Sequence, residues 1–193
     1  MKTLAGECKR AVLAVALLSI LLGGVYPLAV WGIGQLLFPG QANGSLLERE
    51  NEIGGSALVA QPFTSPAYFH PRPSAVDYAV SGVRSGGSNL GPLSRRLYGQ
   101  AIIRIMNYRM ENRLPAAFPI PADAVSASAS GLDPHISPAN AIAQAERVAR
   151  ARGLKIEQVL RLIQLRREGR QLGILGEERV NVLLLNQSLA RQE

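Results

Sequence analysis

An apolar run near the N-terminus is the longest hydrophobic pattern in the chain. No Asp, Glu, Lys or Arg occurs between Ala11 and Leu47, and the part up to Phe38 is mostly Ala, Val, Leu, Ile and Gly. A helix needs about 20 apolar residues to cross a hydrocarbon core of about 30 Å, whereas the apolar core of a cleaved signal peptide has about 7–15 residues. The pattern therefore predicts a retained transmembrane helix over residues 11–38, after a short segment 1–10.

Charges on either side of this run predict its orientation. The N-terminal flank carries Lys2, Lys9 and Arg10, whereas the C-terminal flank begins with the mostly acidic stretch 48–52. Lys and Arg are enriched on the cytoplasmic side of membrane helices. We therefore expect a single-pass protein of the inner (plasma) membrane, with a cytoplasmic N-terminus and a periplasmic or extracellular remainder. The run has no ionisable residue, so it cannot form a conduction path alone.

Two features interrupt the apolar run. Gly23 and Gly24, and further on Gly32 and Gly34, offer a surface for close approach of another helix, although glycine is also simply common in membrane helices. Pro27 lacks a backbone N–H, which favours a kink or an early exit of the chain at that point.

Shorter patterns follow in the more polar remainder, where residues 39–52 read as a linker and residues 53–193 as one globular domain. Short apolar and β-branched segments predict strands at 53–61, 124–128 and 180–185. Apolar residues at helical spacing predict helices at 93–108, at 138–152 and from 159 to near Gly169, before a short polar terminal helix. The expected fold class is α+β: a single N-terminal transmembrane helix followed by one small mixed α/β extracytoplasmic domain.

Two irregular segments separate these elements. Four prolines alternate with aromatic residues over residues 62–73, which predicts an extended conformation for this proline-aromatic segment. Residues 85–92 form a glycine-rich loop ahead of the first predicted helix of the domain.

Composition narrows the possible functions. The formal net charge is +7, but the arginines recur at intervals of three to five residues within predicted helices, as on solvated helix faces. No nucleic-acid-binding motif accompanies them, so a nucleic-acid partner is not expected. The one cysteine, Cys8, precedes the apolar run, so the domain cannot depend on disulfides.

Three patterns suggest chemistry and each has a simpler interpretation. Ser85, Gly86, Gly87 and Ser88 resemble a phosphate loop, but the Lys-Ser/Thr ending of a P-loop is missing, which favours a structural turn. Ser130, Asp133 and His135 are the residue types of a hydrolase triad, but there is no Gly-x-Ser-x-Gly elbow; a membrane-tethered periplasmic hydrolase remains the alternative function. Two histidines without a cysteine in the domain predict no metal site.

Several blocks of the domain together resemble the KdpC family, the C subunit of the bacterial Kdp potassium-transporting P-type ATPase. The most specific is Ser130-Gly131-Leu132-Asp133-Pro134-His135-Ile136-Ser137-Pro138. The other blocks occur in the family's order at positions 55–58, 61–63, 68–75, 85–92, 147–153 and 180–186. The resemblance covers almost the whole chain and implies an accessory subunit beside an A subunit that conducts potassium and a B subunit that hydrolyses ATP.

The resemblance implies two alternative roles. In one, the chain is a catalytic chaperone that promotes ATP binding by the B subunit, with Ser85, Gly86, Gly87 and Ser88 as nucleotide-related residues. In the other, the domain caps the potassium entrance of the A subunit, which the charges around the anchor favour. The expected contacts with partner subunits are made by Tyr68, Phe69, Arg72, Asn89, Asp133 and His135. ATP and potassium would be handled by the complex, with no cofactor on this chain, whose anchor contacts membrane lipid.

Overall fold

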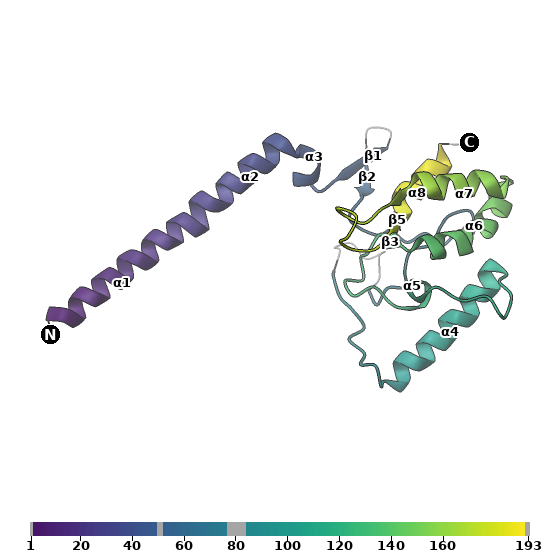
Figure 1. Cartoon of the computed structure of the whole chain (residues 1–193), viewed down its shortest axis with the longest axis horizontal. Helices are drawn as coiled ribbons and strands as arrows, with labels where there is room; N and C mark the ends of the chain where they lie inside the picture. The colour runs from purple at the N-terminus through teal and green to yellow at the C-terminus, as the bar shows by residue number, and fades with distance from the viewer. Residues whose placement is uncertain (1, 50–51, 77–83, 192–193) are drawn as a thin grey trace. The chain divides into compact units, whose positions relative to one another are not determined.

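A computed structural model describes residues 2–49, 52–76 and 84–191 of the chain, which forms two compact units, Met1–Ser56 and Ala57–Glu193 (Figure 1). The first unit is a long apolar helix followed by a short helix and a hairpin. The second is mixed helix and sheet and contains the hydrophobic core. The expected combination of one N-terminal apolar helix with a mixed helix-and-sheet domain is therefore confirmed.

The first unit begins with a continuous helical segment. It consists of α1 (Lys2–Ile20), the π-helical turn η1 (Leu21–Val25) and α2 (Tyr26–Leu37). The stretch Leu4–Leu37 has 34 residues, is apolar enough to cross a membrane, and its most apolar part is not buried in the protein. An apolar helix whose side chains are not buried needs another apolar surrounding, which agrees with the predicted membrane span.

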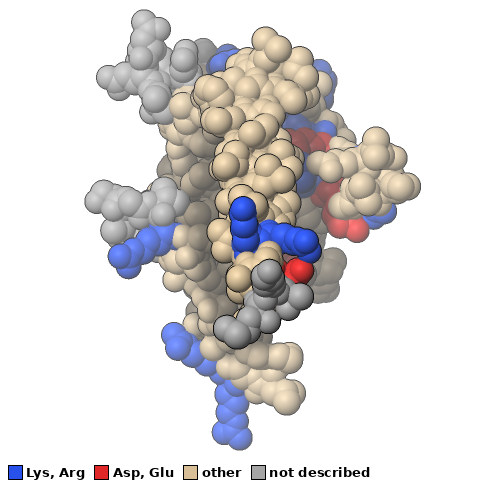
Figure 2. Space-filling model, turned by 90° about the vertical axis from the view of Figure 1, so that its left-hand side faces the viewer, with Lys and Arg blue, Asp and Glu red and all other residues tan. Residues whose placement is uncertain are grey.

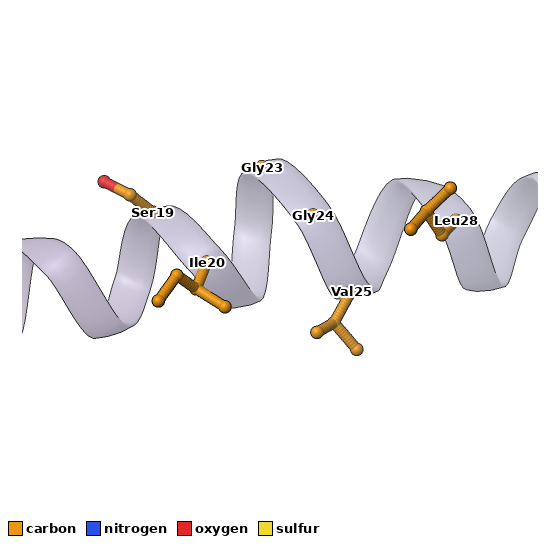
Figure 3. A pocket seen from close by; sticks show the side chains of 6 residues that line it. All are labelled: Ser19, Ile20, Gly23, Gly24, Val25 and Leu28. Carbon is orange, nitrogen blue, oxygen red and sulfur yellow. The ribbon is translucent and has the colours of Figure 1, made fainter.

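A π-helical turn accommodates the proline. The N–H of Tyr26 bonds to the carbonyl of Leu21, five residues earlier, and Pro27 follows immediately inside α2. Such single π-turns absorb local disruption of the helical hydrogen-bond ladder. The helix therefore passes through Pro27, and the expectation of an early exit is wrong. Figure 3 shows the apolar notch at this place, where Gly23 and Gly24 leave a gap bordered by larger side chains.

The segment after the apolar helix, predicted as a linker, contains secondary structure. It contains α3 (Pro39–Ala42) and an antiparallel hairpin of β1 (Leu46–Arg49) and β2 (Glu52–Ser56), with a bulge between Leu47 and Glu48. The strand predicted at 53–61 therefore ends at Ser56. Its partner β1 is only four residues long, so no hydrogen-bonding edge is left for residues 57–61.

The second unit packs helices on a small sheet. Its helices are α4 (Arg95–Asn112), α5 (Ala122–Val125), α6 (Pro138–Arg152), α7 (Ile156–Leu165) and α8 (Val182–Ala190). Its strands are β3 (His135–Ile136), β4 (Arg167–Glu168) and β5 (Arg179–Asn181), antiparallel in the order β3-β5-β4. α6 contacts α7, and α7 contacts α8, while α4 contacts α5 and α6 (Figure 1).

One hydrophobic core joins these elements. It takes Val148 from α6, Ile163 from α7, Val180 from β5 and Leu185 from α8, all fully buried. Phe69, from the proline-aromatic segment, completes it with an exposed fraction of 0%. A fully buried apolar side chain of this size contributes about 1.5–3 kcal/mol to folding. The core therefore pins the otherwise irregular segment 62–73 to the helices.

Helix ends follow the capping rules of the sequence. Ser137 caps α6 by accepting a hydrogen bond from the N–H of Asn140 at 3.1 Å, and Gly153 ends it in the left-handed conformation. Ser94 caps α4 in the same way, so this helix begins two residues later than predicted. α7 ends at Leu165, earlier than predicted, because Arg167 and Glu168 form the edge strand β4.

The other two predicted strands are also wrong, wholly or in part. Residues 124–128 contain no strand: Pro121 starts the short helix α5, which buries Ala124 and has Asp123 in its first turn. In the strand predicted at 180–185, only the first two residues belong to β5. Asn181 then caps α8, its side-chain oxygen accepting from the N–H of Leu184 at 3.1 Å. The cap converts the following apolar run into a helix that delivers Leu185 to the core.

Candidate functional site

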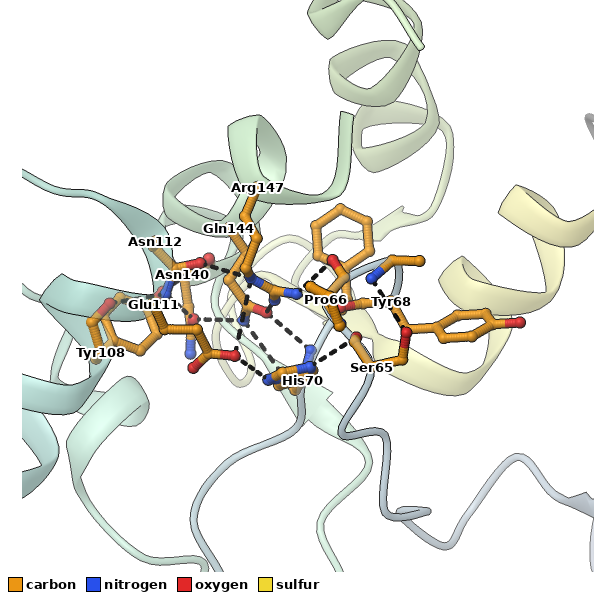
Figure 4. Close-up of polar contacts among 12 residues, drawn as sticks. Ser65, Pro66, Tyr68, His70, Tyr108, Glu111, Asn112, Asn140, Gln144 and Arg147 are labelled. Atoms are coloured by element: carbon orange, nitrogen blue, oxygen red, sulfur yellow. Dashed lines mark hydrogen bonds and ion pairs between the residues drawn. The ribbon is translucent and has the colours of Figure 1, made fainter. Parts of the chain in front are cut away.

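A buried arginine organises the polar part of the domain. Arg147, on the inner face of α6, has an exposed fraction of 5%. Its guanidinium donates to the carbonyls of Pro66 and Tyr68 at 2.7 and 2.9 Å, and to the side-chain oxygens of Asn112 and Gln144 at 3.0 and 2.7 Å (Figure 4). Burial lowers the pKa of Arg147, but an arginine stays charged in proteins. Its charge is therefore held by four acceptors from three parts of the chain.

Two amide side chains hold the proline-aromatic segment as a neighbouring strand would. Asn186 accepts from the N–H of Phe69 at 2.8 Å and donates to the carbonyl of the same residue at 2.9 Å. Gln144 forms the same pair with the backbone of His70, at 2.8 and 3.1 Å. These contacts satisfy backbone groups that have no sheet partner. The segment is therefore rigid although it has no regular secondary structure.

A histidine–carboxylate pair lies next to these amide contacts. His70 Nδ1 lies 2.8 Å from a carboxylate oxygen of Glu111 on α4, and its Nε2 lies 3.0 Å from the carbonyl oxygen of Ser65. The hydrogen bond from His70 holds the pKa of Glu111 below its usual value, despite partial burial. The pair lines a small cavity between α4 and the segment (Figure 4).

A second polar chain anchors α4 and α5 to the start of α6. Asp123 accepts from the N–H and the hydroxyl of Ser137 at 2.7 and 2.8 Å, and from the side chain of Asn140 at 3.0 Å. Asn140 in turn accepts from the hydroxyl of Tyr108 at 2.7 Å. Burial, together with the charge of Asp123, raises the pKa of Tyr108, so the phenol remains a donor.

The loop before β3 carries an ion pair at the edge of a polar groove. Asp133 lies 3.0 Å from the guanidinium of Arg72, accepts from the N–H of His135 at 3.0 Å, and lies 3.4 Å from its Nδ1. Burial raises the pKa of Asp133, but the hydrogen bonds from His135 and Arg72 outweigh burial and lower it to about 2. The groove has a volume of about 420 Å³ and also contains Glu178 and Arg179.

Comparison with known proteins identifies the family. The model of the family described as "K+-transporting ATPase, c chain" matches residues 8–191. Potassium-transporting ATPase KdpC subunits are similar over most of the chain: that of Myxococcus xanthus is 54% identical over 174 residues, which cover 90% of this chain and 82% of the relative. Those of Mycobacterium tuberculosis (H37Rv) and Rhodospirillum rubrum are each 52% identical, over 90% and 94% of this chain and 92% and 93% of theirs. The chain belongs to the KdpC family.

The aromatic pair predicted to contact partners divides into two roles in this KdpC-family domain. Phe69 is fully buried in the core, so it cannot present its ring to a partner, and that expectation is corrected. Tyr68 is half-buried at the surface, where its ring lies 5.4 Å from Phe63 and the guanidinium of Arg152 lies 4.7 Å from its centre. Tyr68 is therefore a fixed, accessible aromatic residue on the proline-aromatic segment.

The glycine-rich loop packs against the turn that contains the most specific KdpC-family block. The N–H of Gly86 donates to the carbonyl of Ser130 at 2.8 Å, and the hydroxyl of Ser85 donates to the same oxygen at 3.1 Å. A side chain on Gly87 would meet the carbonyl oxygen of Ala129 at 2.7 Å. Gly87 thus allows two backbones to approach closely. α4 starts only at Arg95, so the loop is not the N-terminus of a helix. A nucleotide-related role of the loop stays a prediction.

The other four predicted contact residues, Asn89, Arg72, Asp133 and His135, differ in how they are held. Ser88 and Asn89 are exposed at the tip of the glycine-rich loop, where Asn89 adopts a positive φ of 49°. Arg72 is paired with Asp133 and lies beside His135 in the polar groove, so these three predicted contact residues are brought together.

The residue types of a hydrolase triad do not assemble into one. Ser130 accepts from the N–H of Leu132 at 3.1 Å and lies 3.2 Å from the hydroxyl of Ser128. The ring nitrogens of His135 face the carboxylates of Asp133 and Glu168. Within the described residues Ser130 and His135 share no hydrogen bond, so a serine activated by this histidine is not supported.

Sequence reasoning missed the buried polar network. Asn140, Gln144 and Arg147 recur at intervals of four and three residues among the apolar residues of α6, and all three are buried. Polar residues on the apolar stripe of a predicted helix are the signal that would have found them, because a buried polar group needs a partner.

Proposed function

We propose that the chain is a non-catalytic accessory subunit of a high-affinity, ATP-driven potassium import complex. It would assemble with the potassium-conducting A subunit and the ATP-hydrolysing B subunit and stabilise them. One observation carries this proposal: the match to the K+-transporting ATPase c chain extends over residues 8–191, so both the apolar helix and the folded domain belong to it. Potassium and ATP are then handled by the partner subunits.

The charge distribution supports an external location of the domain. Lys9 and Arg10 precede the uncharged part of the apolar helix, Ala11 to Leu37, and acidic residues follow the helix. By the positive-inside rule, this arrangement leaves the N-terminus in the cytoplasm. A domain on the other side has no access to cytoplasmic ATP, which favours the cap at the potassium entrance over the catalytic chaperone.

The proline-aromatic segment is suited to bind the A subunit as part of a cap because its backbone is already ordered. Docking of a flexible segment costs conformational entropy, whereas the hydrogen bonds from Arg147, Gln144 and Asn186 remove that cost in advance. Tyr68 offers an aromatic ring of the type favoured at interface centres. We place the contact with the A subunit on Tyr68, Arg72 and the exposed loop tip at Ser88 and Asn89.

Two single-cysteine chains test the location. The natural chain has only Cys8, ahead of the uncharged part of the helix, and the variant Cys8→Ser/Ser88→Cys has one cysteine on the exposed loop. A membrane-impermeant maleimide added to intact spheroplasts is expected to label the Ser88→Cys chain at once and Cys8 only after lysis. The reverse pattern would exclude the cap and favour the chaperone.

Truncation of the aromatic ring tests the contact itself. Tyr68→Ala is expected to lower co-purification of the chain with the A subunit by about tenfold, as for an interface residue that contributes about 1.4 kcal/mol. The control Leu172→Ala removes a fully solvated side chain from another loop. Equal co-purification of the two variants, with unchanged thermal unfolding, would disprove the contact.

A further inference from the structure

Helix α4 has two apolar faces. Leu97, Ala101 and Ile105 are half-buried on the face turned toward the domain. Beside the exposed polar residues Arg96 and Asn107, the outer face of α4 carries five exposed apolar residues: Tyr98, Ile102, Ile103, Met106 and Met110. Four of these recur every fourth residue and therefore form one continuous stripe. A helix at the surface of a soluble domain normally has a polar outer face.

The exposure of this stripe is high for apolar side chains. Tyr98, Met106 and Met110 have exposed fractions of 72%, 58% and 69%. Figure 1 shows α4 at the edge of the domain, where its other side meets α5 and α6. Contiguous exposed apolar patches with a polar rim mark binding surfaces for proteins or membranes.

Arginines bound the stripe at both ends. Arg95 precedes Tyr98 by three residues and Arg113 follows Met110 by three, so both lie next to the stripe, and both are exposed. At 1.5 Å per residue they stand about 27 Å apart along the helix. Basic side chains project at the lower edge of Figure 2, the edge where Figure 1 places the start of α4.

Arg96 is a further exposed cation at the start of α4, while the other charges of the helix are engaged inside the domain. Arg104 donates to the carbonyl of Val125 at 3.0 Å, and Arg109 donates to the carbonyl of Phe118 at 3.0 Å. Glu111, the one acidic residue of the helix, pairs with His70. The outer face thus combines apolar side chains with cations and carries no acidic residue of α4.

We propose that the outer face of α4 binds the surface of an anionic lipid bilayer. A bilayer offers acyl chains to the stripe. It also offers phosphates all along its surface, so both arginines meet one although they lie about 27 Å apart along the helix. A protein partner would instead have to present two acidic groups at that spacing on either side of an apolar surface. Tyr98, with an apolar ring and a polar tip, is of the type found at headgroup level.

The membrane anchor favours this binding. Residues 39–56 connect the apolar helix with the domain, and a chain of that length spans at most about 60 Å. The domain therefore stays near the bilayer, and even a weak affinity for lipid is enough at such an effective concentration. The proposal holds on either side of the membrane, so its outcome is separate from that of the cap.

Fluorescence quenching in vesicles tests it with the full chain. A fluorophore is attached to Met106→Cys in the Cys8→Ser chain, and the protein is reconstituted into phosphatidylcholine vesicles with or without phosphatidylglycerol. Spin-labelled lipid is expected to quench the fluorophore strongly in the anionic vesicles. A fluorophore on Glu146→Cys, exposed on α6, is the control and is expected to stay unquenched.

Substitution of the arginines is the second part of the test. Arg95→Gln and Arg113→Gln are each expected to lower the ratio of lipid-bound to free domain by about fivefold. Arg113→Lys is expected to leave this ratio unchanged, because it keeps the charge. Quenching at Met106 no greater than at Glu146 in both vesicle types would overturn the proposal. A Met106 fluorophore shielded from both lipid and a water-soluble quencher in the assembled complex would also overturn it, because a protein partner then covers the face.

Discussion

At the scale of single residues, Arg147 decides the conformation of a segment that lies far from it in the sequence. Its guanidinium donates hydrogen bonds to the carbonyls of Pro66 and Tyr68, in place of the N–H groups of a neighbouring strand. A buried charge is tolerated only where it is fully hydrogen-bonded, and here four acceptors surround it. The cation is thus a structural part of the domain.

Removing this cation takes a donor away from all four acceptors, two of which, Asn112 and Gln144, are buried. Arg147→Ala is therefore expected to lower the free energy of unfolding of the domain by about 3–5 kcal/mol, because each buried polar group that loses its partner costs about 1–3 kcal/mol. Arg150→Ala, on the exposed side of the same helix, breaks only a surface pair with Glu146 and is expected to cost less than about 0.5 kcal/mol. Urea unfolding of the full chain in detergent measures both. Similar values for the two variants would contradict the structural role.

Asp133 gives the domain a specific dependence on acid pH. Its pKa is about 2 in the folded protein and near 3.8 when unfolded, so the stabilisation is present above pH 4 and disappears as pH falls from about 4 to 2. Asp133→Asn removes this titration. The free energy of unfolding is measured from neutral pH down to about pH 2. The variant is expected to be less stable than the natural chain at neutral pH and to lose less stability on acidification. Parallel curves of unfolding free energy against pH would refute the assignment.

At the scale of elements, the domain is held together by loops as much as by regular structure. The glycine-rich loop meets the turn Ser128–Gly131 through backbone contacts that leave no room for side chains. Gly131 has a φ of 74°, and a Cβ there would lie 2.7 Å from the carbonyl oxygen of Gly86. The contact therefore requires glycine for space as well as for conformation.

Comparison of Gly131 with Gly153, which also has a left-handed backbone conformation, separates the need for space from the need for that conformation. Gly153 also has a positive φ, of 66°, but a Cβ there meets nothing within 4 Å. Gly153→Ala is expected to cost about 1 kcal/mol of unfolding free energy, the conformational part alone. Gly131→Ala adds the steric clash and is expected to cost at least about 2 kcal/mol more. Thermal unfolding of both variants gives the difference, and equal costs would mean that the loops do not pack this closely.

At the scale of the whole molecule, one apolar helix and one folded domain serve a complex of several subunits. The π-turn beside Pro27 keeps the helix continuous, and the notch at Gly23 and Gly24 interrupts its apolar side chains (Figure 3). Small residues of this kind allow close approach of a second membrane helix. The notch is therefore where we expect a partner's helix to pack.

Filling the notch tests this packing. Gly24→Leu keeps the segment apolar, so membrane insertion is expected to be unchanged, while co-purification with the partner subunits falls several-fold, as for a loss of about 1 kcal/mol. Ala14→Leu, an exposed position of α1 outside the notch, is the control. Equal recovery of partners with both variants would show that the notch is not a contact.

The periodic elements followed from the sequence alone. The membrane helix, α4 and α6 were predicted because apolar spacing and the caps Ser137 and Gly153 act locally. Strands near 124 and 182 were mispredicted because a two- or three-residue strand has no periodicity, and the capping side chain of Asn181 outweighs the β-branched residues beside it.

The sequence by itself determined an apolar anchor, a mixed domain and the KdpC resemblance, since each depends on residue order alone. Only the tertiary structure decided that Phe69 belongs to the core while Tyr68 faces outward, and that Ser130 and His135 remain apart. It also brought Arg147 to carbonyls about 80 positions away. Such long-range contacts depend on how helices pack, and that geometry is not encoded in the spacing of any one segment.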